Sequence, residues 1–289
     1  FFLLQAIGAV ESPKHEIRAV WLTTIYGLDW PKKPATTEVG RKAQQQELCS
    51  MLDKLADANF NTVFLQVRLR GDVIYRSAIE PASKTFSGKY GTMPGYDPLA
   101  FAIEECHKRG MECHAWFVTF PIGTDKAVKE QGKLSVVKRN PKLCKRHNGE
   151  WYLDPGVPET ADYILSLVKE LVNGYDIDGI QFDYIRYPEQ AKTFPDKAVH
   201  QKYGKSTRLA DWRRENINKM VYRIYDWVKL AKPWVQVSSS PLGKYNRIER
   251  VPNAGWTAYE SVFQDPKMWM EKGKQDMIVP MMYYLHDNF

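Results

Sequence analysis

The stretch GIQFDYIRYP, residues 179–188, decides the fold assignment. It begins as a short apolar run typical of a strand and ends on the carboxylate of Asp183, which Tyr184, Arg186 and Tyr187 follow closely. A strand needs no charge at its end, whereas a ligand site at the mouth of a barrel does. We therefore expect a buried strand that delivers Asp183 to a binding site.

Strand-like and helix-like segments alternate on both sides of this stretch. The other strand-like runs are 16–24, 61–68, 111–118, 234–241 and 276–284, and the helical patterns cover 41–59, 97–110, 158–175, 211–233 and 258–273. The strand runs are nearly continuous in apolar residues, which is typical of strands covered on both faces. Alternating units of this kind predict a parallel sheet with helices outside it.

The loop motifs separate the two main parallel folds. No GxGxxG follows the first strand and no GxxxxGK[ST] occurs, which disfavours a doubly wound nucleotide-binding sheet. The sequence therefore predicts an α/β fold of the TIM (β/α)8-barrel type. Six strands are recognisable before the chain stops at Phe289. We expect the last one or two βα units to be missing, and the segments 69–96, 119–157 and 186–210 to be loops at the carboxyl ends of the strands.

Charge and cysteine content point to neither a nucleic-acid partner nor a metal. The net charge is +7, and the densest basic stretch, 136–150, has turn residues without interleaved aromatic side chains, so we interpret it as a solvated loop. The four cysteines, Cys49, Cys106, Cys113 and Cys144, form no CxxC pair and fit no zinc spacing. We expect structural thiols, no cofactor and a monomer.

The first residues, FFLLQAIGAV, form an apolar run with a small-residue end. The run resembles the tail of a signal peptide and is too short to span a membrane. Its alternative is an ordinary N-terminal segment packed on the domain. We expect residues 1–15 to be an N-terminal segment of one of these two kinds, and residues 16–289 to be one barrel domain. We expect the protein to be secreted or periplasmic.

Carboxylates, arginines and aromatic rings recur where the predicted strands end. They are Asp29 and Trp30 after the first strand, Arg68, Arg70 and Asp72 after the second, His114 and Trp116 in the third, Asp183, Tyr184, Arg186 and Tyr187 after the fourth, Ser238, Ser239 and Ser240 at the fifth, and Tyr283, Tyr284, His286 and Asp287 after the sixth. In a barrel these ends converge on one site. Carboxylates with aromatic rings suit glycoside cleavage, in which one carboxylate attacks or stabilises the anomeric carbon and one acid protonates the leaving oxygen. Arg186 would keep Asp183 ionised for the first role.

Several long motifs together resemble the glycosyl-hydrolase-like 10 family, also called DUF187. They are EIRAVWLTT (16–24), LDWP (28–31), FNTVFLQVRLRGDVIY (60–75), PGYDPLAFAIEECHKRGMECHAWF (94–117), YDIDGIQFDYIRYP (175–188), DWRRENINKMV (211–221) and DMIVPMMYY (276–284). The resemblance implies a secreted or periplasmic (β/α)8 barrel, often a lipoprotein. At least one branch of the family acts on peptidoglycan glycan strands stripped of their peptides.

The resemblance also implies site residues. Asp183 matches the acidic position at the end of the fourth strand, where related barrel glycosidases carry their nucleophile. Arg68 and Asp72 match the RxRGD segment after the second strand, and His114 and Trp116 match the HAWF segment of the third. These residues are therefore expected at the active site.

The proton donor is less clearly marked. Many members have a second acid directly after the fourth-strand Asp, where this sequence has Tyr184. We expect the donor to be Asp72, with Asp287 as second choice. The residues expected to bind substrate are Asp29, Trp30, Arg68, His114, Trp116, Tyr184, Arg186, Tyr187, Tyr283 and Asp287.

Three functions stay open on the sequence. The first is a glycoside hydrolase acting on a polysaccharide, with peptide-free peptidoglycan strands as one candidate. The second is a carbohydrate-binding pseudoenzyme with the same cleft. The third is a metal-dependent deacetylase or a lyase, which only His114 and Asp72 support.

Overall fold

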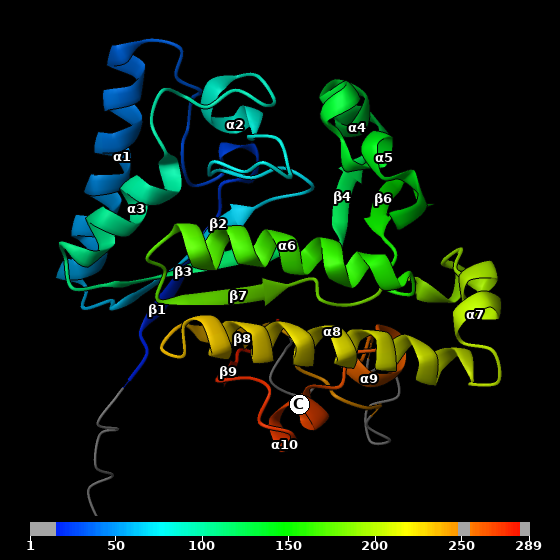
Figure 1. The fold of residues 1–289 in the computed structure, drawn as a ribbon. Coiled ribbons are helices and arrows are strands. Elements are labelled where there is room, and N and C mark those ends of the chain that lie inside the picture. Colours follow the sequence, from blue (N-terminus) through cyan, green and yellow to red (C-terminus); the bar gives the residue numbers. More distant parts are fainter. Residues whose placement is uncertain (1–15, 248–254, 284–289) are drawn as a thin grey trace, which may run out of the picture.

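The computed structural model of the protein describes residues 16–247 and 255–283. Its main sheet has six parallel strands (Figure 1). In spatial order they are β1 (Ala19–Leu22), β2 (Thr62–Arg68), β3 (Glu112–Val118), β7 (Gly179–Asp183), β8 (Gln236–Ser239) and β9 (Met277–Ile278). Spatial order follows chain order throughout, whereas a doubly wound sheet would reverse direction at a switch point. The order is that of a (β/α) barrel wound in one direction.

Helices fill the connections between these strands. The four long ones are α1 (Glu38–Asp57), α3 (Pro98–His107), α6 (Pro158–Gly174) and α8 (Leu209–Ala231). Figure 1 shows α6 and α8 side by side, and α1 beside α3. The predicted start of α3 is confirmed, because the Asp97 carboxylate accepts hydrogen bonds from the amides of Leu99 and Ala100, both at 3.1 Å.

The helix predicted over 258–273 is wrong in detail, because the structure has two short helices there. They are α9 (Ala258–Ser261) and α10 (Pro266–Glu271). Phe263 lies between them with a positive φ of 60°, which a continuous helix does not permit. Asp265 then starts α10 by accepting a hydrogen bond from the amide of Met268 at 3.1 Å.

The segment 119–157, predicted as a loop, forms a second sheet instead. Its antiparallel strands are β4 (Pro121–Thr124), β5 (Cys144–His147) and β6 (Glu150–Leu153), in the order β4-β6-β5, and it also contains α4 (Asp125–Gln131) and α5 (Val136–Arg139). Asn148 and Gly149 make the two-residue turn between β5 and β6, with φ of 48° and 81°. Asn-Gly is a strong hairpin signal in a sequence, so the basic stretch 136–150 is not a simple solvated loop.

The two other segments predicted as loops are largely irregular and hold only short helices. These are α2 (Lys84–Ser87) in the first, and η4 (Ala191–Thr193) and α7 (Lys197–Tyr203) in the second. A short helix, η1 (Ile25–Gly27), follows β1, and η2 (Gly132–Leu134) and η3 (Pro141–Leu143) flank α5.

Strand register defines which side chains share one face of the main sheet. His114, Trp116 and Val118 of β3 lie opposite Gly179, Gln181 and Asp183 of β7. Successive strand residues alternate between faces, so these form one face. A Cβ atom on Gly179 would lie 2.3 Å from Nδ1 of His114, which explains why glycine stands beside this histidine. The alternate residues, including Phe117 and Phe182, are buried on the other face.

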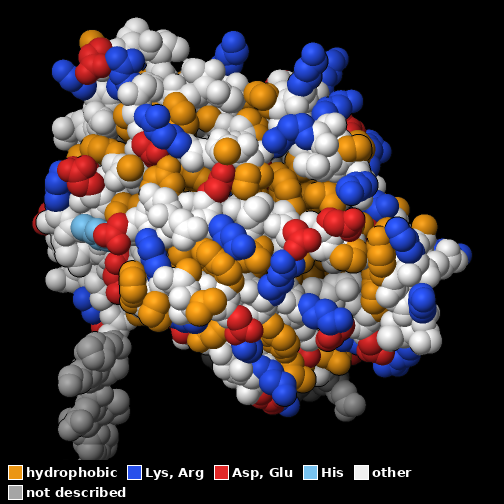
Figure 2. Space-filling view, viewed as in Figure 1, with side chains coloured by type: hydrophobic (Ala, Val, Ile, Leu, Met, Phe, Trp, Pro, Cys, Tyr) orange, Lys and Arg blue, Asp and Glu red, His pale blue; other side chains and the backbone are white. Residues whose placement is uncertain are grey.

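The surface and the thiols complete the description. In the view of Figure 2, Lys and Arg side chains are scattered among acidic and apolar ones over α6 and α8. Across the described ranges, no helix combines the length and apolar character that crossing a membrane requires. All four cysteines are free thiols; Cys49 is half-buried and the other three are buried.

Candidate active site at the carboxyl ends of the strands

Asp183 lies at the carboxyl end of β7, and both of its carboxylate oxygens are held. The indole Nε1 of Trp116 donates to Oδ2 at 3.1 Å, and the backbone amide of Tyr184 donates to Oδ1 at 2.7 Å. Tyr184 has a positive φ of 50°, a conformation that non-glycine residues seldom adopt outside special sites. The structure therefore brings together three of the predicted site residues and orients the carboxylate.

Burial sets the protonation behaviour of this carboxylate. The side chain is only 8% exposed, and burial raises the pKa of Asp183, whereas the positive charges of Arg186 and Arg70 act to lower it. Burial is the larger effect. Arg186 therefore favours the ionised form, as expected, but the desolvation of Asp183 outweighs the effect of the arginine on its pKa.

Two arginine–glutamate pairs lie near Asp183. Arg186 donates from Nη2 to Oε1 of Glu189 at 2.8 Å, and its guanidinium stacks over the Tyr184 ring, 4.6 Å from the centroid. Its Nε and Nη1 groups are buried without a hydrogen-bond partner. Arg70 donates from Nη1 to Oε1 of Glu150 at 2.6 Å. These pairs place strong polar groups around the carboxylate at the end of β7.

The sequence interpretation missed Glu150 and Glu189. Glu150 belongs to β6 in the second sheet, and its Oε2 accepts a hydrogen bond from the Tyr152 hydroxyl at 2.9 Å. It directly follows the Asn-Gly turn, which is the signal that could have revealed the hairpin. Glu189 follows Arg186 by three residues, but sequence spacing alone does not distinguish an ion pair from two solvated charges.

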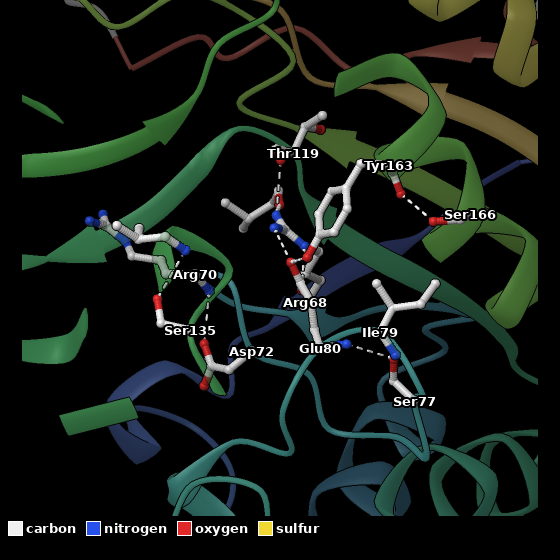
Figure 3. A network of polar contacts seen from close by, with 12 residues as sticks. Arg68, Arg70, Asp72, Ser77, Ile79, Glu80, Thr119, Ser135, Tyr163 and Ser166 are labelled. Carbon is white, nitrogen blue, oxygen red and sulfur yellow. Dashed lines mark hydrogen bonds and ion pairs between the residues drawn. The ribbon is translucent and has the colours of Figure 1, made fainter. Parts of the chain in front are cut away.

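The prediction that Arg68 binds substrate is wrong, because its guanidinium is enclosed in the protein interior. It lies fully buried, and its Nε and Nη2 donate to the Glu80 carboxylate at 2.8 and 2.7 Å. The Tyr163 hydroxyl donates to the same carboxylate at 2.8 Å (Figure 3). The group is a buried ion pair with every charged partner hydrogen bonded.

The buried pair acts on Asp183 through the backbone. Nη1 of Arg68 donates to the carbonyl oxygens of Val118 and Thr119, the latter at 2.9 Å. The amide and hydroxyl of Thr119 in turn donate to the carbonyl oxygen of Asp183 at 2.8 and 2.9 Å. Arg68 is therefore a positioning residue that fixes the strand ends carrying the site.

Asp72 lies in the turn after β2 and is buried. Its Oδ1 accepts a hydrogen bond from the Arg70 amide at 3.1 Å, and burial raises the pKa of Asp72 to about 6. It lines a small cavity of about 40 Å³ that Arg70, Tyr26 and Tyr90 also line. A pKa near 6 suits a proton donor at neutral pH. No described contact joins Asp72 to Asp183, so its role as donor stays a prediction.

Trp30 and Tyr187 are packing residues rather than substrate contacts, and both predictions are wrong. Trp30 is fully buried, and its Nε1 donates to the Gln44 carbonyl oxygen at 2.8 Å. Tyr187 is fully buried with edge contacts to Phe194 and Phe263 at 5.5 and 5.6 Å. Large aromatic side chains contribute most of their energy through such burial.

The prediction that His114 binds substrate is also wrong. It is fully buried, its Nε2 lies 3.0 Å from Oε2 of Glu112, and it stands opposite Gly179, the first residue of β7. Asp183 is the last residue of that strand. His114 thus lies at the opposite end of the sheet from the site and from Asp72, and the two cannot share a metal. Among residues 16–247 and 255–283, no group of three or more His, Cys, Asp or Glu side chains could hold a metal ion.

The hydrogen bonds described for the Asp183 carboxylate come from neither Asp29 nor Tyr283. Asp29 accepts a hydrogen bond on Oδ2 from the Thr23 amide at 2.9 Å and so stabilises the turn after β1. Tyr283 follows β9 and is 88% exposed. Asp287 and residues 1–15 lie outside the described residues.

A sequentially wound parallel sheet with carboxylates and arginines at its carboxyl edge defines a (β/α)-barrel protein with a candidate site at the strand ends. The model of the family described as glycosyl hydrolase-like 10 matches residues 16–288, and the chain belongs to that family. The predictions of family and barrel fold are confirmed.

Two curated relatives of the chain are named glycosyl hydrolases. The chain is 36% identical over 281 residues to glycosyl hydrolase YngK of Bacillus subtilis (strain 168), covering 93% of this chain and 54% of YngK. It is 34% identical over 296 residues to glycosyl hydrolase DigH of Escherichia coli (strain K12), covering 96% of this chain and 67% of DigH. The chain therefore spans about half the length of YngK.

One solved structure supports the fold. The chain is similar to the glycoside hydrolase domain of PgaB (BpsB) from Bordetella bronchiseptica, with a TM-score of 0.59 and 14% identity. The match covers 92% of this chain and 74% of that chain. At this identity the similarity shows a shared fold.

Proposed function

We propose that the chain is a glycoside hydrolase that cleaves O-glycosidic bonds in a polysaccharide, with Asp183 as the carboxylate that attacks or stabilises the anomeric carbon. The observation that carries the proposal is the geometry at the end of β7. There, Trp116 and the Tyr184 amide each donate to one carboxylate oxygen. A carboxylate fixed in this way is preorganised for charge developing at the sugar.

The second acid in this proposal is Asp72. A glycosidase needs a group that is protonated at working pH to donate to the leaving oxygen. Burial raises the pKa of Asp72 to about 6, which keeps a useful fraction protonated near neutrality. Glu150 and Glu189 instead hold arginines in ion pairs, an arrangement that suits positioning rather than proton donation.

For the substrate we propose glycan strands of peptidoglycan stripped of their peptides, met outside the cell or in the periplasm. Each muramic acid unit carries a lactyl carboxylate, and a protein with a net charge of +7 attracts such a polyanion. The motif resemblance to the family favours the same substrate. Other acidic glycans would be attracted by the same charge.

The direct test is the variant Asp183→Asn, which keeps the shape of the side chain and removes its charge. We expect loss of at least about 1,000-fold in turnover of the glycan, because the nucleophile or its charge is gone. Asp226→Asn on the outer helix α8, where the carboxylate is 58% exposed, is the matched control and should retain activity. Full activity in folded Asp183→Asn protein would contradict the proposal.

A carbohydrate-binding protein without turnover is the second candidate. It is favoured by one observation, namely that Asp72 lines a separate small cavity and makes no described contact with Asp183. This candidate predicts saturable binding of the glycan without shortened products. The deacetylase or lyase reading loses its support, since His114 lies at the opposite end of the sheet from Asp72.

A further inference from the structure

A cavity of about 520 Å³ lies between the loops that follow β7 and β8. Its lining includes Glu189, Lys192, Trp256, Glu260 and Ser261. We propose that this cavity is an additional sugar-binding subsite, in which a pyranose unit remote from the cleaved bond stacks on the indole of Trp256. The inference rests on the proposed function, which supplies the glycan, and adds a binding site to it.

The position of the cavity is the first argument. Glu189 follows β7 and Trp256 follows β8, and these two strands are parallel neighbours. Loops after neighbouring strands of a barrel meet at its carboxyl face, where substrates bind. A volume of about 520 Å³ is within the range of small-molecule sites, so it can hold one sugar unit.

The exposed indole is the second argument. Trp256 is 52% exposed although it lines a concave site. The apolar face of a pyranose can cover such an indole, which removes apolar surface from water. Trp234 is more exposed, at 66%, but precedes β8 and so lies at the amino end of the strands. It serves as a matched control.

Continuity with the Asp183 site is the third argument. Glu189 lines the cavity and also accepts the hydrogen bond from Nη2 of Arg186 at 2.8 Å. Arg186 in turn is close enough to Asp183 for its charge to lower the pKa of that carboxylate. Glu189 therefore links the wall of the cavity to the arginine whose charge acts on Asp183.

The polar lining fits a polyhydroxyl ligand. Glu189, Glu260 and Ser261 offer acceptors, and Lys192 and Arg247 offer donors. Sugar hydroxyls both donate and accept, so they can use groups of both kinds.

The cavity wall at Phe263 is joined by hydrogen bonds and ring packing to the segment that follows β7. The amide of Tyr187 donates to the Val262 carbonyl oxygen at 3.1 Å, and Gln264 donates from Nε2 to the Ile185 carbonyl oxygen at 3.4 Å. Phe263, which lines the cavity, packs edge-on against Tyr187 at 5.6 Å. These contacts hold residues 185–187 against residues 262–264, so Phe263 is already in place on the cavity wall.

The test uses Asp183→Asn protein as a non-cleaving background. A peptide-free peptidoglycan disaccharide and longer oligosaccharides of the same repeat are titrated by calorimetry. Adding Trp256→Ala should weaken binding of the longer oligosaccharides by about tenfold or more, the factor that corresponds to ~1.4 kcal/mol, and leave the disaccharide unchanged. Trp256→Phe should restore part of the affinity, and Trp234→Ala should change nothing.

The inference is overturned if Trp256→Ala binds the longer oligosaccharides as tightly as the background protein. It is also overturned if Trp234→Ala weakens binding equally, since the effect would then be general. A further outcome is that the protein with Asp183 intact cleaves the glycan, and that Trp256→Ala leaves its kcat/KM for long glycans unchanged. This outcome would reject the subsite and leave the proposed function standing. Binding that depends on Trp256, without any cleavage, would reject the proposed function and leave the subsite standing.

Discussion

Replacing Glu80 by Gln tests the buried ion pair that supports the site. Arg68 and Glu80 both have fully buried side chains, and Gln fills the same volume while removing the negative charge. The Arg68 charge would then be left in a desolvated place without a negatively charged partner, beside backbone carbonyl groups and the Phe117 ring. Breaking a buried pair in this way generally costs 3–5 kcal/mol.

The expected loss lies near the lower end of that range. Arg68 keeps its hydrogen bonds to the carbonyl oxygens of Val118 and Thr119, and Gln can still accept from the Tyr163 hydroxyl. We therefore expect the free energy of unfolding to fall by about 3 kcal/mol, a large part of the 5–15 kcal/mol typical of folded domains.

Urea unfolding followed by tryptophan fluorescence measures this loss from the shift in midpoint multiplied by the slope. Glu38→Gln is the control, because Glu38 and Arg41 form an exposed pair with side chains 62% and 30% exposed. Such a pair contributes about 0–1 kcal/mol. A loss in Glu80→Gln as small as the loss in Glu38→Gln would refute the reasoning, as would a double variant Arg68→Met/Glu80→Leu that is less stable than the single one.

Three further predictions concern protonation and thiol accessibility. Burial raises the pKa of Asp72 from 3.8 to about 6, so the folded state binds this proton more tightly and loses the associated stability as the pH rises from about 4 to about 6. The free energy of unfolding of Asp72→Asn should therefore match that of the parent protein at pH 4 and exceed it by up to about 3 kcal/mol at pH 7.5. An equal difference in the free energy of unfolding at both pH values would contradict this prediction. If Asp183 acts in its ionised form, its raised pKa should place the acidic limb of kcat/KM above the value of ~3.9 for an ordinary Asp; a limb at or below that value would disagree. Since Cys49 alone of the four thiols is only half-buried, one thiol should react with Ellman's reagent in the native protein and four after unfolding, and rapid reaction of Cys106, Cys113 or Cys144 would count against the fold.

The sequence was sufficient for the main sheet. Each of its six strands falls within a predicted strand run, although β8 itself, Gln-Val-Ser-Ser, is mostly polar. Helices with strong start signals, such as Asp97-Pro98, separate the strands. The second sheet escaped prediction because its strands have only four residues each and lie in a polar, basic stretch. Periodicity is uninformative over such short runs, and the Asn148-Gly149 turn was the one clear signal.

The site was predicted in part. Asp183, Tyr184 and Trp116 do meet at the end of β7, because strand ends in a barrel converge. The position of a residue near a strand end does not determine on which face of the sheet its side chain lies, or with which group it forms a hydrogen bond or an ion pair. Arg68 forms an ion pair with Glu80, twelve residues further along the chain, and is buried in the protein interior. His114 is the third of seven residues in β3, a position that already placed it away from the carboxyl end.

The central claim is that Asp183 carries glycoside hydrolysis, and mass spectrometry of the products tests it most directly. Peptide-free peptidoglycan strands are incubated with the protein and, separately, with Asp183→Asn protein. We predict shortened glycans from the first, each cleavage adding the mass of one water, and intact strands from the second. Intact strands in both samples, or equal shortening in both, would contradict the account.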